Sequence, residues 1–151
     1  MKTIALTHDF DSLVKAYEAK PEATKKMVRL QLKMAVRDVR EYASSHHRYT
    51  TRSGVMERQG IATDVEDTKA TISISESVPY GVFLHEGTKA HDIRPRNKVA
   101  LRWATVQEFV FAKRVRHPGI KSDPFLYNAV DAELPKIVTR FEAKLKAILE
   151  G

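Results

Sequence analysis

Proline and glycine divide the middle of this 151-residue chain into short segments, and this feature constrains the fold most. Four of the six prolines and three of the six glycines lie between Pro79 and Pro124. Proline fixes the backbone angle φ, and glycine permits conformations closed to other residues, so both favour turns between short elements. The flanking sequences carry less of this punctuation. We therefore expect a central region of strands and rigid loops between helical ends.

Apolar residues recur at helical spacing on both sides of this region. The pattern predicts a short amphipathic helix over residues 9–20 and a longer one over residues 22–45. Near the other end, Asp123 is a suitable N-cap and Pro124 a suitable first residue for a helix that reaches the C-terminus. Pro135 lies inside that helix and predicts a kink or break near residues 132–134.

Between the helical ends, alternation of apolar and polar residues predicts a mostly antiparallel sheet of four to five strands. The expected strands cover residues 61–66, 69–75, 91–94, 99–105 and 109–116, with a further short strand at residues 3–7. Trp103 is expected in the core, because Leu101 and Phe111 offer it apolar neighbours. Single helical turns are expected at residues 55–60 and 80–86, the second ended by Gly87. The predicted class is α+β, with N-terminal helices and a long C-terminal helix packed on one face of the sheet.

One domain over residues 1–151 accommodates all of these elements. It would comprise a helical part at residues 1–47, sheet and loops at 53–122, and the C-terminal helix at 123–151. The absence of cysteine excludes disulfides, cysteine-based metal sites and thiol catalysis. No apolar run approaches the roughly 20 residues that span a bilayer, so no membrane partner is expected.

Positive charge is concentrated in the central region. The whole chain has a net charge of +7, and the segment from Lys89 to Lys121 has nine bases and two acids. Arg94, Arg96 and Lys98 could form a basic stripe with Arg114 and Arg116. Since no reading motif accompanies these bases, nucleic-acid binding through them would use unspecific phosphate contacts. The competing readings are an acidic protein neighbour and the lining of a pore through which DNA passes.

The most enzyme-like residues are two histidine–acid pairs, His85 with Glu86 and His91 with Asp92. Side chains adjacent in sequence point apart on a helix or a strand, so neither pair makes a metal site by itself. His117 lacks a nucleophile beside it in the sequence, and no phosphate-binding loop is present. We expect no enzymatic activity, no metal and no cofactor. A hydrolase using His85, Glu86 or His117 would require a pocket in which they converge.

Five short motifs in the central region occur in an order that resembles a known family. These are an aromatic turn ending in Glu86-Gly87-Thr88, an Ile-x-Pro, an Ala-Leu-x-Trp, a Val-x-His-Pro-Gly and a Pro-Phe-Leu. The matching positions are Tyr80, Phe83, Glu86, Gly87, Thr88, Ile93, Pro95, Ala100, Leu101, Trp103, Val115, His117, Pro118, Gly119, Pro124, Phe125, Leu126 and Ala129. In this order the motifs resemble the tail-completion or neck proteins of long-tailed bacteriophages, also described as minor tail components.

The resemblance implies a non-enzymatic α+β virion protein at the head–tail junction, assembled in the host cytoplasm. It implies a ring of its own copies, expected to be hexameric, between a tail terminator or tail tube and a head-closure or connector protein. DNA would cross the lumen without sequence recognition. We hypothesise that the following residues lie at contacts between subunits or rings: Glu86, His91, Arg94, Arg96, Arg116 and His117. The alternative is a basic nucleic-acid-binding module that uses unspecific phosphate contacts.

Overall fold

The structure is a computed structural model that describes residues 10–150. The strand expected at residues 3–7 lies outside the described residues. The chain divides into two compact units. One unit is formed by both ends of the described chain, up to Pro79 and again from Phe125, and the other by Tyr80–Pro124. The single expected domain thus consists of a unit of terminal segments and a unit of the central segment.

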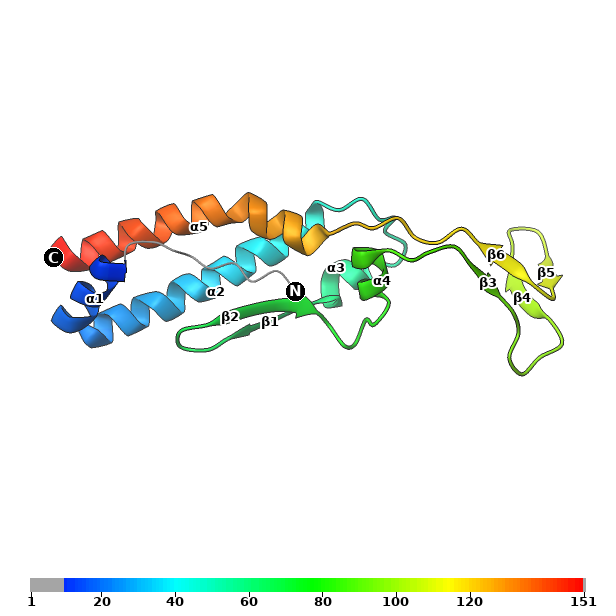
Figure 1. The fold of residues 1–151 in the computed structure, drawn as a ribbon, viewed down its shortest axis with the longest axis horizontal. Coiled ribbons are helices and arrows are strands. Elements are labelled where there is room, and N and C mark those ends of the chain that lie inside the picture. The colour runs from blue at the N-terminus through cyan, green and yellow to red at the C-terminus, as the bar shows by residue number, and fades with distance from the viewer. Residues whose placement is uncertain (1–9, 151) are drawn as a thin grey trace. The chain divides into compact units, whose positions relative to one another are not determined.

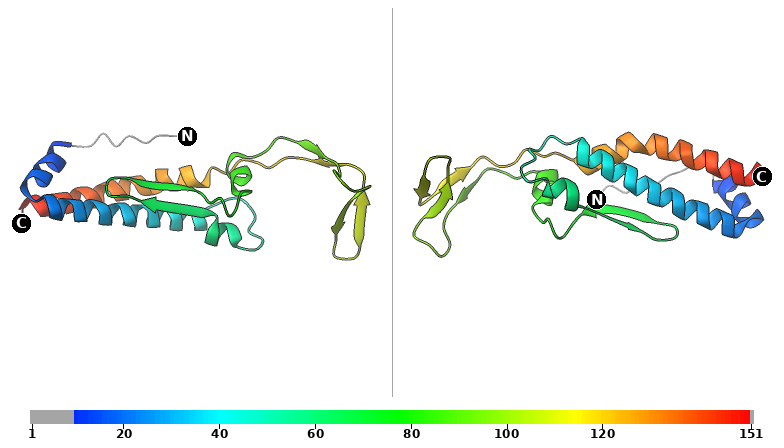
Figure 2. Two further views of the ribbon diagram at one scale, coloured as in Figure 1. Left: turned by 90° about the horizontal axis from the view of Figure 1, so that it is seen from below. Right: turned by 180° about the vertical axis from the view of Figure 1, so that it is seen from behind.

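Two long helices are the largest elements of the first unit. Helices α2 (Pro21–Ser45) and α5 (Phe125–Glu150) lie side by side in every view (Figures 1 and 2). Helix α1 (Phe10–Ala19) packs against both of them. The three helices bury a cluster containing Ala16, Met27 and Leu145, because each helix turns one apolar stripe inward. No helix within residues 10–150 is long and apolar enough to cross a membrane.

A short helix and a hairpin complete the first unit. Helix α3 (Val55–Gln59) leads into strand β1 (Ile61–Val65), which pairs antiparallel with β2 (Ala70–Ile74). Both strands pack against α2. Helix α3 and both strands match the ranges predicted from the sequence to within one residue at each end, because strong apolar alternation and flanking polar turns mark them.

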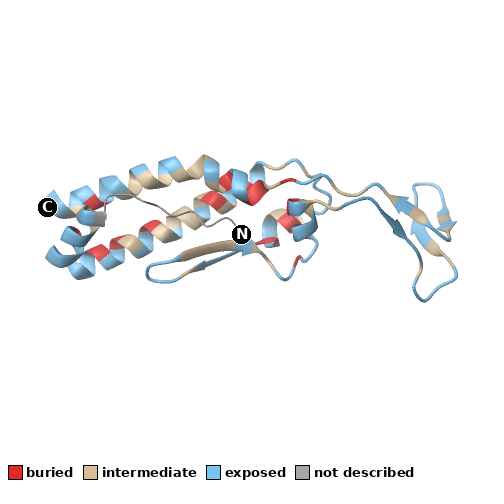
Figure 3. Ribbon diagram, in the orientation of Figure 1, coloured by how far each residue is buried: buried red, intermediate tan, exposed pale blue. Residues whose placement is uncertain are grey.

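The second unit contains one short helix and four short strands. Helix α4 (Gly81–Glu86) precedes β3 (His91–Ile93), which pairs with β6 (Val115–His117). Between them, β4 (Leu101–Ala104) pairs with β5 (Phe109–Ala112). Both ladders are antiparallel. Figure 3 shows these strands almost entirely as exposed or intermediate, so the ladders have little core of their own.

The predicted α+β class is confirmed, including the antiparallel strands and the long C-terminal helix. The arrangement of the strands differs from the prediction: the described strands form three two-stranded sheets instead of one sheet of four to five. The strand expected at residues 109–116 is two strands, β5 and β6, separated at Lys113 and Arg114. Helix α5 also runs through Pro135 without the expected break.

A polar contact joins the two long helices. On α5, the Arg140 guanidinium donates one hydrogen bond to Gln31 Oε1 (3.1 Å) and another to Asp38 Oδ2 (2.7 Å), both on α2. Gln31 is buried and Asp38 is half-buried. Burial opposes ionisation of Asp38, but the hydrogen bonds and charges of Arg140 and Arg37 outweigh it and lower the pKa of this carboxyl. Arg140 therefore satisfies two polar groups that are shielded from water.

Replacing Arg140 with alanine is expected to destabilise the chain by about 1–3 kcal/mol, since it leaves Gln31 and Asp38 without this donor. The contribution of Asp38 is present above its ordinary pKa of 3.8 and is lost as the pH falls through the lowered value. Denaturant unfolding at pH 7 and at acid pH measures both effects. The control is Arg37→Ala, whose exposed side chain hydrogen-bonds the adjacent Asp38 but not the other long helix. An equal loss in both variants would contradict this role of Arg140.

Candidate interaction surface

A backbone bridge holds together the two segments that begin and end the second unit. The Thr88 amide donates to the Ile120 carbonyl (2.8 Å), and the Ile120 amide donates back to the Thr88 carbonyl (3.1 Å) and hydroxyl (3.0 Å). Next to it, the Ser122 hydroxyl donates to the His85 carbonyl (2.9 Å) and the Asp123 amide to the Leu84 carbonyl (3.1 Å). These bonds fix α4 against the segment that returns from β6.

Two glycines make this close approach possible. Gly87 has φ 79° and ψ 173°, a conformation open essentially to glycine alone. A Cβ on Gly87 would lie 2.7 Å from the Ile120 carbonyl oxygen and 2.7 Å from the Ser122 nitrogen. Gly119 has φ 90°, and a Cβ there would lie 2.3 Å from the Thr88 carbonyl oxygen. Any side chain at either position would therefore push the bridging segments apart.

The substitution Gly87→Ala is expected to open the bridge locally, because backbone strain of this kind costs about 1–3 kcal/mol. The amides of Thr88 and Ile120 should then exchange hydrogen faster, which NMR measures residue by residue. Lys89→Ala, at an exposed neighbouring position, is the matched control and should leave these amides protected. Unchanged protection in the Gly87 variant would show that the bridge does not depend on this glycine.

Beyond the bridge, the β3–β6 ladder brings together three of the six predicted contact residues. His91 pairs with His117, their rings stacked at 5.1 Å between centroids, and Arg116 pairs with Asp92. Arg114 also forms an ion pair with Asp92 at 2.8 Å. The Gly119 amide donates to His117 Nδ1 (3.1 Å), which ties this ring to the turn. The ladder thus presents a histidine pair on one face and charged side chains on the other.

The other three predicted contact residues lie outside this ladder. Glu86 ends α4, and Arg94 and Arg96 follow β3. Of the six, His117 is half-buried and the others are exposed. All six therefore belong to the second unit, but the structure does not gather them into one compact site.

The β4–β5 hairpin carries apolar surface that the sequence analysis did not identify as functional. Trp103 is 42% exposed, Phe109 56% and Phe111 65%, while Val99 and Val106 are more exposed still. Trp103 was expected in the core, and this expectation is wrong: a two-stranded ribbon has no second layer to cover it. The guanidinium of Arg102 lies 4.5 Å from the centre of the Phe109 ring, a cation–π contact. The hairpin is therefore both aromatic and basic.

The enzyme-like residues have different surroundings. His85 is buried in α4, and burial lowers the pKa of its ring, outweighing the nearby charges of Glu86 and Asp123. His91 and His117 lie in the β3–β6 ladder instead. Among residues 10–150, no three or more histidine, aspartate or glutamate side chains lie close enough to hold a metal ion.

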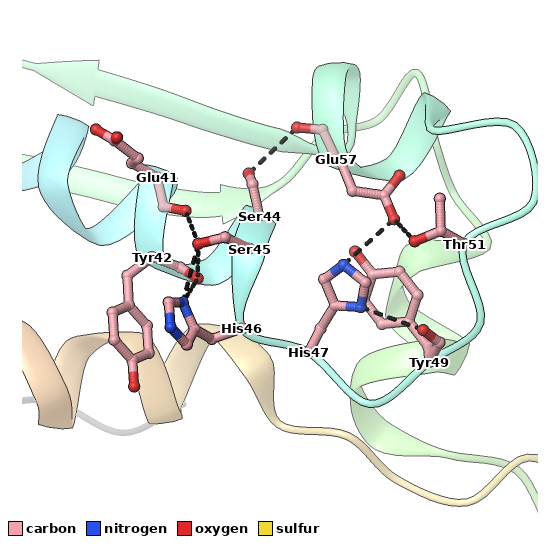
Figure 4. A network of polar contacts seen from close by, with 9 residues as sticks. All are labelled: Glu41, Tyr42, Ser44, Ser45, His46, His47, Tyr49, Thr51 and Glu57. Atoms are coloured by element: carbon pink, nitrogen blue, oxygen red, sulfur yellow. Dashed lines mark hydrogen bonds and ion pairs between the residues drawn. The ribbon is translucent and has the colours of Figure 1, made fainter.

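A polar network in the first unit orders the loop after α2 (Figure 4). Glu57 Oε1 accepts a hydrogen bond from the Thr51 hydroxyl and lies 3.4 Å from His47 Nε2. Burial opposes ionisation of Glu57, but the hydrogen bond from Thr51 and the charges of His47 and Arg58 lower its pKa overall. Threonine and histidine contact the same carboxylate oxygen, and His47 Nδ1 faces the Tyr49 carbonyl (3.2 Å). With both nitrogens so engaged, the ring is not placed to activate Thr51 as a nucleophile.

Comparison of the chain with models of known protein families, with curated proteins and with solved structures gives no match.

Proposed function

We propose that this chain is a structural subunit of the neck of a long-tailed bacteriophage, which completes the tail and joins it to the head. In this role its copies form a ring through which DNA passes. The observation that carries the proposal is the second unit: a rigidly bridged pair of antiparallel ladders that exposes aromatic and basic side chains. Such a surface is suited to docking against other subunits, because little backbone freedom remains to be lost on binding.

The motifs of the resemblance support the proposal in their structural setting. Glu86-Gly87-Thr88 and His117-Pro118-Gly119 come from distant parts of the sequence, and they supply the glycines on either side of the Thr88–Ile120 bridge. Pro124-Phe125-Leu126 follows the same bridge and begins α5 with two buried side chains. Two of the five motifs thus meet at the bridge, and a third begins the helix that follows it. Their conjunction is harder to obtain by chance than any of the motifs alone.

The positive charge of the second unit is compatible with a lumen through which DNA passes and with contact to acidic protein neighbours. Arg94, Arg96 and Lys98 are all exposed in the loop between β3 and β4. Charged side chains in such positions favour encounter and exclude wrong partners more than they add affinity. The loop is therefore a suitable place to perturb assembly without perturbing the fold.

Reversing two charges, Arg94→Glu with Arg96→Glu, is expected to block the joining of heads and tails while the chain folds normally. The phage that encodes the chain supplies the assay: electron microscopy counts free heads, free tails and joined particles, and circular dichroism checks the fold. Lys26→Glu with Lys33→Glu makes the same charge change at exposed positions of α2 and is the matched control. Joined particles at the normal frequency in the arginine variant would contradict this assignment.

The alternative function, a basic nucleic-acid-binding module, is favoured by one observation, the exposed aromatic and cationic side chains of the β4–β5 hairpin. It requires affinity for bare DNA that falls steeply with salt, because phosphate contacts release counterions. A ring subunit requires self-association or binding to neck partners instead. Sedimentation of the chain with and without duplex DNA, at two salt concentrations, separates the two functions.

A further inference from the structure

The first unit has a large apolar groove between α1, α2 and α5. Its volume is about 1020 Å³, and its apolar lining includes Leu13, Val28, Leu32, Ile137, Val138 and Phe141. Sites for small molecules typically have volumes of roughly 300–1,000 Å³, so this groove has room for several side chains. Val14 and Tyr17, at its edge, are each about half exposed. The groove extends the helical core but is not covered within residues 10–150.

The β4–β5 hairpin carries exposed apolar side chains that could fill such a groove. Arg102 is opposite Phe111 and Trp103 is opposite Val110, so apolar side chains occupy both faces of the ribbon. Val106, in the connection between the strands, is fully exposed. Exposed apolar surface of this extent on a ribbon without a core is typical of a binding element.

The charges around the two surfaces also match. Three acids, Glu18, Asp67 and Glu142, line the groove together with one base, Lys25. Asp67 and Lys25 each have an ion-pair partner, Arg29 (3.5 Å) and Glu22 (3.2 Å), so the rim stays acidic overall. The hairpin region carries Lys98, Arg102 and Lys113 against one acid, Glu108. Complementary charge guides such an encounter and fixes its register. One surface is therefore apolar with an acidic rim, and the other is aromatic with basic neighbours.

We propose that the groove of one subunit receives the β4–β5 hairpin of a second copy of this chain. Because two different surfaces meet, the contact is heterologous, and a bound pair still offers one free groove and one free hairpin. Repetition of the contact gives a closed ring or an open filament. The contact itself does not depend on the proposed function; only the expectation that it closes into a neck ring rests on that function.

The absence of cysteine from the natural chain makes a direct test possible. One variant carries Val106→Cys in the hairpin, and a second, tagged to differ in mass, carries Val138→Cys in the groove. The two are mixed and treated with a short bis-maleimide, and the products are separated on a denaturing gel. We expect a heterodimer that forms several-fold faster than with the control Ala143→Cys, an exposed position of α5 outside the groove. Adding Phe109→Ser and Phe111→Ser to the hairpin variant should remove this product.

A heterodimer no more abundant than with Ala143→Cys would overturn the proposal. So would rapid cross-linking within single molecules of a Val106→Cys/Val138→Cys double variant at high dilution, since the groove would then hold the hairpin of its own chain. Efficient cross-linking of Thr7→Cys to Val138→Cys within one chain would assign the groove to residues 1–9 instead. If heads and tails join normally without the hairpin–groove product, this inference fails and the proposed function stands. If the hairpin–groove product forms in a chain that does not join heads to tails, this inference stands and the proposed function fails.

Discussion

The close pairing of Thr88 with Ile120 is the constraint on which the second unit depends. It brings together residues that are 32 positions apart, and everything between them, including both ladders, lies within the loop that this pairing closes. Closing a loop of that length costs conformational entropy, which the backbone hydrogen bonds and the neighbouring Ser122 and Asp123 contacts offset. Gly87 and Gly119 permit the approach. These two glycines therefore have a structural purpose in the sequence.

The two units differ in how they are stabilised. The first buries apolar stripes of three helices and links α2 to α5 through Arg140, so it resembles an ordinary helical core. The second relies on ladder hydrogen bonds and a few buried residues, of which His85 and Asp123 are polar. Its aromatic side chains remain exposed, and exposed apolar surface of this kind is typical of an interaction site. The proposal that this unit is an assembly element follows from that contrast.

Much of the fold is predictable from the sequence because apolar periodicity directly reports a buried face. Helices α1, α2 and α5 and the β1–β2 hairpin have strong patterns of this kind and lie where they were predicted. Periodicity does not report which strands pair, and for that reason one sheet was expected where three ladders exist. Pro135 illustrates a different limit: packing of α5 along α2 outweighs the local cost of one missing helical hydrogen bond. Trp103 was misplaced because its apolar neighbours were assumed to form a second layer.

The candidate site was only partly predictable, because sequence patterns do not report which strands pair or which layers cover them. The charge count located the basic segment, and the pairing of His91 with His117 explains why two of the predicted residues lie together. The aromatic side chains of β4–β5 are exposed because no layer covers the ribbon, and no local sequence pattern reports that absence. We expect this hairpin to become buried when the protein assembles. Hydrogen exchange of its amides in the dilute chain and in joined particles tests this expectation directly. Strong new protection of β4 and β5 is expected in the particle, and equally fast exchange in both states would show that the hairpin stays exposed.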